Sequence, residues 1–352
     1  MKLGLGLSGT MLNPENLRFA RQAGVTHIIA HMPGYRRSHE QPPPTPPGGP
    51  AHTGEGTIWS YEELRDLRQM VNAEGLELEA LENFNPAFWS DVLLDGPRKH
   101  AQMENLKTLI RNVGKAGIPI FGYNFSIAGV WGRVNGPYAR GGAIGPAFLE
   151  PEEPPIPNGM VWNMVYDPNA PPGFVSPVSH DQLWERVEYF LRNILPVAEE
   201  AGVVMAAHPD DPPLPILRGA ARLIYQPRFY QQLFDRVPSP NSQAEFCVGT
   251  LSEMTEGDIY ETVETYSSTN KIAYVHLRNV RGKVPRYYEV FVDEGDTDLL
   301  RVLRILAKNN YQGVIIPDHA PQMNCPAPWH AGMAFALGYI RAGITLALNG
   351  SH

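Results

Sequence analysis

The chain has few cysteines, few charges and no long apolar run. Only 2 of its 352 residues are cysteine, which excludes a disulfide framework and leaves a thiol free to act as a thiolate ligand in a reducing compartment. Charged residues make up 19% of the chain and hydrophobic residues 43%, so a sizeable core can be buried. No signal-type apolar region opens the sequence, and no run approaches the roughly 18 apolar residues of a membrane span. We therefore expect a cytoplasmic protein with no membrane partner.

An excess of basic residues is also absent. The formal net charge is −8, whereas proteins that bind nucleic acids usually carry a basic face that neutralises phosphates. This acidic charge argues against a nucleic-acid partner. It also disfavours a metal-dependent endonuclease barrel, which would need a basic groove. Small anionic substrates remain compatible with local arginine residues.

Short apolar runs alternate with amphipathic stretches along the whole chain. Parallel strands that are covered on both faces are near-continuously apolar, and helices of ten or more residues between them indicate βαβ units. Eight such units predict an α/β fold, a (β/α)8 barrel that forms one domain over residues 1–352. The expected strands cover residues 2–7, 25–32, 75–83, 118–125, 203–208, 243–247, 271–276 and 311–318. The expected helices cover residues 14–24, 60–73, 98–116, 181–201, 226–236, 257–267, 297–309 and 329–347, with Pro196 bending or interrupting the helix over 181–201.

Two segments rich in proline and glycine, residues 33–58 and 126–178, interrupt this alternation. Each falls between a strand and the following helix, after the second and the fourth expected strand, and so belongs to the catalytic face of a barrel. We expect these insertions to form a lid or an oligomer contact, because long loops in compact domains usually have a functional role. Linkers between separate domains are the alternative reading.

Four residues that can bind a metal stand at the ends of the last expected strands: His208, Cys247, His276 and Asp318. The carboxyl ends of barrel strands meet at one rim, which is where catalytic groups gather. Imidazole, thiolate and carboxylate together suit a divalent transition ion, and coordination chemistry alone favours Zn²⁺ or Fe²⁺ over Mg²⁺ or Ca²⁺. Taken singly, each residue has an ordinary structural reading, such as a core histidine, a small apolar filler or a turn cap.

Other polar residues at the same rim are candidates for handling a substrate. Arg278 lies two residues beyond His276 and is expected on the same side, where a guanidinium can grip a carboxylate. His319 can act as a general acid or base beside a metal, or it can orient a ligand. Strand ends and the long loop supply the remaining candidates, for which bonding within the rim is an equal alternative: Glu82, Asn83, Tyr123, Asn124, Trp131, Arg133 and, more weakly, His31.

A combination of motifs in this chain resembles the mannonate dehydratase family. The motifs are His-Pro-Asp-Asp-Pro-Pro at 208–213, Gly-Thr at 249–250, His-Leu-Arg at 276–278, Gly-Asp-Thr-Asp at 295–298 and Pro-Asp-His at 317–319. The resemblance implies a xylose-isomerase-like barrel that uses Mn²⁺, or sometimes Fe²⁺, to convert D-mannonate into 2-keto-3-deoxygluconate. It implies that His208, Cys247, His276 and Asp318 bind the metal and that His319 is catalytic, with Trp329 standing where the family carries a substrate-facing tyrosine.

The site suggests a reaction, and other readings stay open. The metal would bind an aldonic acid, a base would remove the proton α to its carboxylate, and His319 or another acid would protonate the departing β-hydroxyl, with Arg278 neutralising the carboxylate. A sugar isomerase or epimerase on the same barrel, or a non-catalytic barrel that binds a sugar acid, would use the same metal site. We expect a small-molecule sugar acid as partner and a homo-oligomer as assembly.

Overall fold

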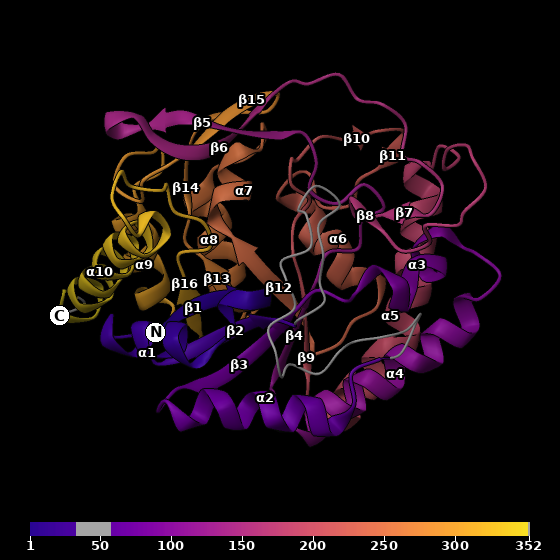
Figure 1. The fold of residues 1–352 in the computed structure, drawn as a ribbon, viewed down its shortest axis with the longest axis horizontal. Helices are drawn as coiled ribbons and strands as arrows, with labels where there is room; N and C mark the ends of the chain where they lie inside the picture. The colour runs from indigo at the N-terminus through magenta and orange to yellow at the C-terminus, as the bar shows by residue number, and fades with distance from the viewer. Residues whose placement is uncertain (33–57, 351–352) are drawn as a thin grey trace.

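A closed barrel of eight parallel strands forms the centre of the computed structural model, which describes residues 1–32 and 58–350 (Figure 1). In chain order, each barrel strand pairs with the next one, and the last pairs with the first. The strands are β1 (Lys2–Ser8), β2 (His27–His31), β3 (Glu77–Glu82), β4 (Ile120–Tyr123), β9 (Val204–Ala207), β12 (Ser242–Cys247), β13 (Ile272–His276) and β16 (Val314–Ile316). The barrel expected from the sequence is confirmed.

The alternation of side chains along each strand divides the barrel into an inner and an outer core. On β12, Ala244 and Phe246 belong to the large core between the strands and the helices, so Glu245 and Cys247 point to the interior. A smaller cluster fills the inside of the barrel with Ile29, Ala80, Ile120, Ala206, Ala273, Tyr274, Val314 and Ile316. Polar residues at the carboxyl ends of the strands therefore lie above a packed apolar floor.

Helices surround the barrel at the positions that the sequence predicts. They are α1 (Pro14–Gln22), α2 (Tyr61–Ala73), α4 (Lys99–Lys115), α5 (His180–Ala201), α6 (Arg228–Arg236), α8 (Ile259–Ser268), α9 (Leu299–Lys308) and α10 (Pro328–Asn349). Ser60 and Glu63 form the capping box that starts α2, and α5 runs without interruption through Pro196. Two short helices that the sequence does not predict, α3 (Pro86–Leu94) and α7 (Val248–Glu253), follow β3 and β12 directly.

Helix α10 bears on the expectation that the chain has no membrane span. Its length of 22 residues and mean hydropathy of 1.5 make it, within residues 1–32 and 58–350, a helix that could cross a membrane by length and composition. Its buried residues include Met333, Leu337 and Ile340, which join the core beside α9 and β1. A core helix of a barrel passes the same composition test, and the packing of α10 is that of a core helix.

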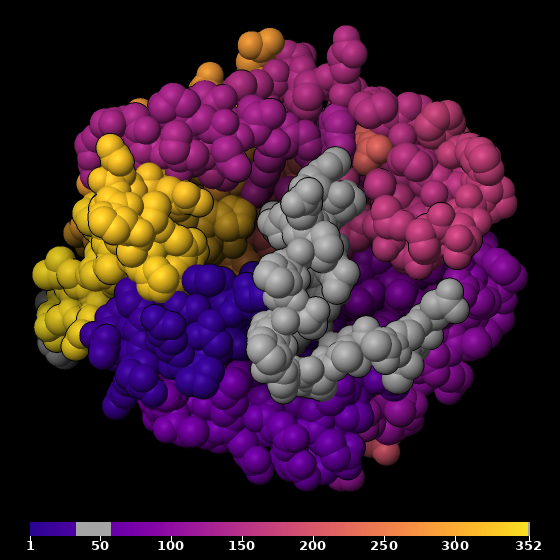
Figure 2. All heavy atoms as spheres, in the orientation of Figure 1, coloured from indigo at the N-terminus to yellow at the C-terminus, as the bar shows by residue number. Residues whose placement is uncertain are grey.

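The long loops after β4 and β13 build a separate four-stranded antiparallel sheet. Its strands are β5 (Arg133–Ala139), β6 (Ala143–Leu149), β14 (Asn279–Lys283) and β15 (Arg286–Val290), in the order β14-β15-β6-β5. In Figure 1 this sheet lies at the upper left of the view, and in Figure 2 the magenta segment that includes β5 and β6 borders the yellow C-terminal helix. Segments far apart in the sequence thus share one sheet on the side where the barrel strands end.

Smaller elements complete the insertion after β4 and the loop after β9. They are the 3-10 helix η2 (Arg140–Gly142), the pair β7 (Met160–Val161) and β8 (Met164–Val165), and the pair β10 (Ile216–Leu217) and β11 (Ala220–Ala221). A further 3-10 helix, η1 (Gly9–Met11), follows β1. The other expected insertion, residues 33–58, lies outside the described residues except for Ile58.

Candidate active site

Three of the four expected metal ligands form one cluster at the carboxyl ends of the barrel strands. Cys247 and His276 are direct partners in the register of β12 and β13, and His208 follows the last residue of β9. One ligand atom from each of the three lies within 4.8 Å of the others. The fourth, Asp318, follows β16 and brings its Oδ2 to 3.6 Å from the Nδ1 of His276. Its φ of 60° is in the left-handed region, which aspartate tolerates better than most residues.

The electrostatic surroundings of the cluster favour a thiolate. Burial raises the pKa of the Cys247 thiol, but the Arg278 guanidinium and hydrogen bonds with His208 and His276 outweigh burial and hold the pKa well below its usual range. Thr250 donates from its amide (3.4 Å) and its hydroxyl (3.2 Å) to the Cys247 Sγ. The thiolate that accepts these hydrogen bonds is the form of cysteine that can bind a metal.

The His208 imidazole is oriented by the backbone carbonyl of the next residue, Pro209. Its Nδ1 lies 2.6 Å from the carbonyl oxygen of Pro209; because a carbonyl only accepts, Nδ1 donates, and in the neutral ring Nε2 then carries the lone pair. Burial lowers the pKa of His208, yet the hydrogen bond with Cys247 raises it to about 9. Imidazole, thiolate and carboxylate donors within one small volume fit a divalent transition ion.

Arg278 is almost completely enclosed by carboxylates, with an exposed fraction of 1%. Its Nη1 lies 3.0 Å from Glu253 and 2.8 Å from Glu289, and its Nη2 lies 2.9 Å from Asp211. Its Nε lies 3.2 Å from the Oδ2 of Asp318. The expectation that Arg278 shares the side of His276 agrees with this placement, but a grip on a substrate carboxylate would require it to exchange one of these partners.

Arg133 ties the insertion after β4 to the same group of carboxylates. From β5 it forms an ion pair with Asp211 and lies 3.0 Å from Glu289 of β15. Tyr287 donates to Asp211 at 2.8 Å. Burial raises the pKa of Asp211, but Arg133 and Arg278 hold it far below its usual range. Arginines and carboxylates from four segments thus form one buried network beside the metal ligands.

His319 stands at the edge of this network and is the most accessible of the catalytic candidates. Its side chain is 36% exposed, and its Nδ1 lies 2.8 Å from the Oε2 of the buried Glu289. Its Nε2 lies 3.5 Å from the Oδ1 of Asp318. This placement gives His319 one fixed nitrogen and one nitrogen near the metal ligands, as a proton-transfer group requires.

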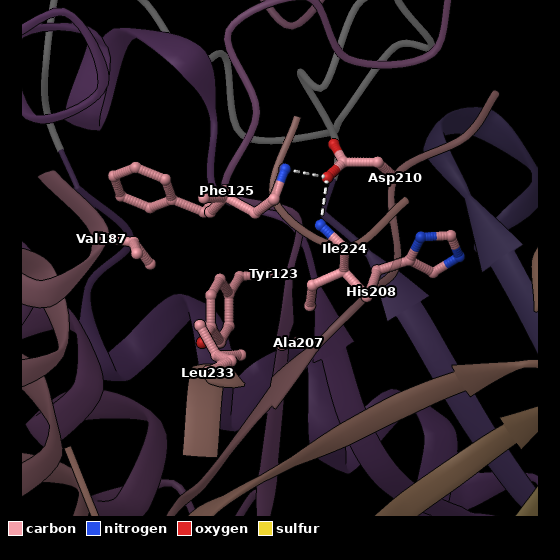
Figure 3. A pocket seen from close by; sticks show the side chains of 9 residues that line it. Tyr123, Phe125, Val187, Ala207, His208, Asp210, Ile224 and Leu233 are labelled. Atoms are coloured by element: carbon pink, nitrogen blue, oxygen red, sulfur yellow. Dashed lines mark hydrogen bonds between the residues drawn. The ribbon is translucent and has the colours of Figure 1, made fainter. Parts of the chain in front are cut away.

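Tyr123 and Asn124 contact the backbone of His208 and not the ligand atoms of the cluster. The Tyr123 ring packs 5.2 Å from the Phe190 ring of α5, in a small cavity of the outer core. Figure 3 shows this cavity with the His208 imidazole pointing away from it; the lining residues are Tyr123, Phe125, Val187, Ala207, His208, Asp210, Leu223, Ile224 and Leu233. Asn124 donates to the Pro209 oxygen at 3.2 Å and accepts from Trp162 at 3.1 Å. Both side chains hold the rim together.

The remaining substrate candidates occupy three separate places. Asn83 follows β3 with a φ of 67°, and its backbone N–H donates to the carbonyl oxygen of Gly122 at 2.8 Å. Trp131 packs under the guanidinium of Arg218, 5.0 Å from its ring centroid. Trp329 is near the start of α10, and its ring centroid lies 6.0 Å from that of Phe19 in α1. Among the described residues, these contacts do not join the three side chains to the metal cluster.

Several polar residues of the site escape the sequence reasoning. Asp211 belongs to the motif at 208–213, which gives it no individual role, and Glu253 and Glu289 lie in a short helix and a short strand, where no periodicity marks them. Glu245 sits in an apolar run, two residues before Cys247 and therefore on the same face, which is a signal that could have been used. It lies 3.3 Å from His276 inside the barrel.

A closed parallel barrel with a cluster of side chains that could hold a metal ion at the carboxyl ends of its strands is typical of one class: barrel enzymes that use a divalent ion. Solved structures support the fold. The chain matches a xylose isomerase domain protein from Planctomyces limnophilus at a TM-score of 0.61 with 12% identity, covering 99% of both chains. An L-ribulose 3-epimerase matches at 0.59 with 14% identity, covering 99% of this chain and 96% of the other. At such identity the likeness concerns the fold alone.

Nearer relatives identify the family. The model of the D-mannonate dehydratase (UxuA) family matches residues 1–143 and 174–347. The mannonate dehydratase of Streptococcus pneumoniae (strain 70585) is 32% identical over 278 residues, 75% of each chain. The structure of mannonate dehydratase from Streptococcus suis serotype 2 matches at a TM-score of 0.81 with 27% identity, covering 100% of this chain and 94% of that one. The chain belongs to the D-mannonate dehydratase family, a family of hydro-lyases.

Proposed function

We propose that this protein removes water from D-mannonate to give 2-keto-3-deoxy-D-gluconate. The observation that carries the proposal is that the family match spans both ends of the barrel and includes the close cluster of His208, Cys247 and His276. A sugar acid is the substrate class that the family implies. The single-domain organisation, the homo-oligomer and the cytoplasmic location stay predictions.

The metal is proposed to be Mn²⁺, with Fe²⁺ as the alternative and Zn²⁺ compatible with the donor types. His208, Cys247, His276 and Asp318 would hold it, since they offer imidazole, thiolate and carboxylate donors at one rim. A bound divalent ion would act as a Lewis acid toward the carboxylate or a hydroxyl of the aldonic acid and make the proton at C2 more acidic. Asp318 would serve the reaction in this way, as a ligand.

The reaction breaks two bonds of the substrate and forms one. A base takes the proton from C2, the C3–O bond breaks, and a C2=C3 double bond forms. We propose that His319 acts as an imidazolium and gives the proton on Nε2 to the departing C3 hydroxyl, while its Nδ1–H stays bonded to Glu289. The resulting enol becomes a ketone at C2, and water leaves. Arg278 would support this step by fixing Asp318 at 3.2 Å and favouring the Cys247 thiolate.

Residues at the rim would recognise the sugar acid. Arg133 is placed near His319, in the network with Glu289, and is the candidate best situated to meet a substrate at the rim. Asn83, Trp131 and Trp329 stay predictions as substrate contacts. Tyr123 and Asn124 would act on the substrate only indirectly, through the rim that they support.

The experiment that tests the proposal is an assay of Mn²⁺-loaded protein against a panel of aldonic acids, with detection of 2-keto-3-deoxy acids. We expect product from D-mannonate and little from its epimers. Formation of an epimer or ketose without loss of water would replace the proposal by an isomerase or epimerase. Stabilisation by a sugar acid without any turnover would instead indicate a binding protein.

A further inference from the structure

Two buried carboxylates lie deeper in the barrel than the metal ligands and face His276. The Oε1 of Glu245 lies 3.3 Å and the Oε2 of Glu82 lies 3.6 Å from the Nε2 of His276. The exposed fraction is 0% for Glu245 and 8% for Glu82. The other ring nitrogen, Nδ1, faces Asp318 at 3.6 Å. The two nitrogens of His276 therefore meet different partners, ligands on one side and carboxylates on the other.

We propose that Glu245, assisted by Glu82, is a positioning residue for His276: with an ion bound, its carboxylate would accept a hydrogen bond from the Nε2–H group, which leaves Nδ1 as the metal-binding nitrogen. The inference rests on the proposed metal-dependent function. A neutral imidazole that binds an ion through one nitrogen keeps its proton on the other. A carboxylate that receives this proton fixes the ring orientation and makes the ligand more basic, which strengthens metal binding.

The fold leaves Glu245 little freedom to turn away. Glu245 is the register partner of Tyr274 on β13, and both side chains point to the inside of the barrel. On the opposite side, a Cβ built on Gly122 of β4 would collide with the Oε2 of Glu245 and with the Tyr274 hydroxyl. The carboxylate thus occupies space that exists because residue 122 has no side chain.

Glu82 is held in the same way by a second histidine. Its Oε1 lies 3.2 Å from the Nε2 of His31, while its Oε2 faces His276. Glu82 therefore spans two neighbouring imidazoles and keeps its carboxylate between them. This shared contact explains why we assign the main positioning role to Glu245, which is nearer to His276 and completely buried.

The two histidine ligands differ in the group behind them. His208 has a neutral backbone carbonyl at its Nδ1, whereas His276 has a pair of carboxylates at its Nε2. A carboxylate acceptor polarises the ring more than a carbonyl does. The groups that face His276 are side chains, so mutation can remove them. The binding of the ion by His276 should therefore respond to mutation of these carboxylates.

A different occupant of the inner cluster can be distinguished by experiment. Glu82, Glu245 and His276 also place ligand atoms within 4.8 Å of one another, which is the spacing of a second divalent-ion site. Simultaneous occupation of both sites through His276 would require its ring to lose both N–H protons. We therefore favour one ion with a positioned histidine, and a count of bound ions separates the two arrangements.

The test compares the full-length wild type with Glu245→Gln, Glu245→Met and the control Glu79→Gln. Glu79 also faces a strand histidine, His27, at 3.6 Å, but it lies toward the amino-terminal ends of the strands. Titration calorimetry with Mn²⁺ gives the affinity and the number of ions per chain. We expect Glu245→Met to weaken binding by about 10- to 100-fold, Glu245→Gln to weaken it less because an acceptor oxygen remains, and Glu79→Gln to match the wild type.

A second readout follows the site without relying on affinity or activity. In protein loaded with Co²⁺, the thiolate-to-cobalt absorption of Cys247 should persist in Glu245→Met but shift, because the thiolate stays bound while His276 moves. Gly122→Ala should produce a similar shift and a similar loss of Mn²⁺ affinity, since the added methyl group displaces the Glu245 carboxylate. This variant keeps the test decisive if the methionine variant fails to fold.

Two outcomes would overturn the inference. One is Mn²⁺ affinity and cobalt absorption in Glu245→Met and Gly122→Ala that equal those of the wild type. The other is two ions per wild-type chain, one of which is lost when Glu245 is replaced. The proposed function fails separately, if wild-type protein binds Mn²⁺ and dehydrates no aldonic acid; the ratio of affinities between variant and wild type still decides the role of Glu245.

Discussion

The Oε2 of Glu289 accepts a hydrogen bond from the Nδ1 of His319 over 2.8 Å. Burial raises the pKa of Glu289, but the guanidinium groups of Arg133 and Arg278 hold it below its usual value. An ionised carboxylate can only accept, so it fixes the proton of His319 on Nδ1 and turns Nε2 toward Asp318. The catalytic candidate is thus oriented by a strand that belongs to an inserted hairpin, not to the barrel.

Replacement of His319 by asparagine should lower kcat for D-mannonate by about 10²- to 10⁴-fold, the usual contribution of a proton-transfer group. KM should change far less, because the ion and its ligands remain. Steady-state kinetics on Mn²⁺-saturated protein measures both constants. The matched control is His330→Asn, since His330 bonds Asn16 at 2.9 Å on the outer surface of the barrel. Near-wild-type turnover of His319→Asn would remove His319 from the mechanism.

Removal of the metal should lower the thermal stability of the wild type. An ion present at about 1,000 times its Kd stabilises the folded state by about 4 kcal/mol, and this difference should disappear when a chelator is added. Cys247→Ser should show little difference in Tm with and without Mn²⁺, because a hydroxyl replaces the thiolate. Cys325→Ser should behave as the wild type, since Cys325 is exposed. Equal Mn²⁺ stabilisation of both variants would exclude Cys247 as a ligand.

Arg133→Met should destabilise the protein strongly. Its loss leaves Asp211 and Glu289 buried with one guanidinium fewer, and breaking a buried ion pair from one side costs about 3–5 kcal/mol. Arg286→Met, on the same small sheet, removes an exposed pair with Glu150 and should cost about 0–1 kcal/mol. Denaturant unfolding measures both free energies. Equal effects of the two changes would mean that Arg133 is not a structural link.

Stability should fall at alkaline pH in part through Tyr266. Burial raises the pKa of its phenol to about 12 in the folded protein, whereas the unfolded value is about 10. Its contribution is therefore fully present below pH 10 and is lost as the pH rises toward 12. Between these values the free energy of unfolding should decline less steeply for Tyr266→Phe than for the wild type. A steeper decline for the variant would contradict the assignment.

The barrel could be predicted because each strand is a short apolar run with a ligand-type or polar end. VVMAAH, QAEFC and KIAYVH each bury their side chains on two faces, which leaves a recognisable pattern. The metal cluster followed from the rule that such ends share one rim. The register that pairs Cys247 with His276 cannot be predicted from a sequence pattern, because it depends on how neighbouring strands align.

The buried network of arginines and carboxylates could not be predicted, for a physical reason. Arg133 and Glu289 come from strands of two insertions that pair only in three dimensions, and proline and glycine in these segments hide their alternation. Arg278 has no partner that the sequence reveals, so its position two residues past His276 predicts a contact with substrate. Glu245 stands within an apolar run, although its position two residues before Cys247 places it inside the barrel.

The pairing of β6 with β15 has an evolutionary consequence. Hairpins from the loops after β4 and β13 share one sheet, and that sheet supplies both Arg133 and Glu289 to the mouth of the barrel. A lineage that lengthened or shortened one hairpin would unpair the other and release His319 with it. We therefore expect the two loops to change length together among relatives, so that new substrate preferences arise by paired rather than independent insertions.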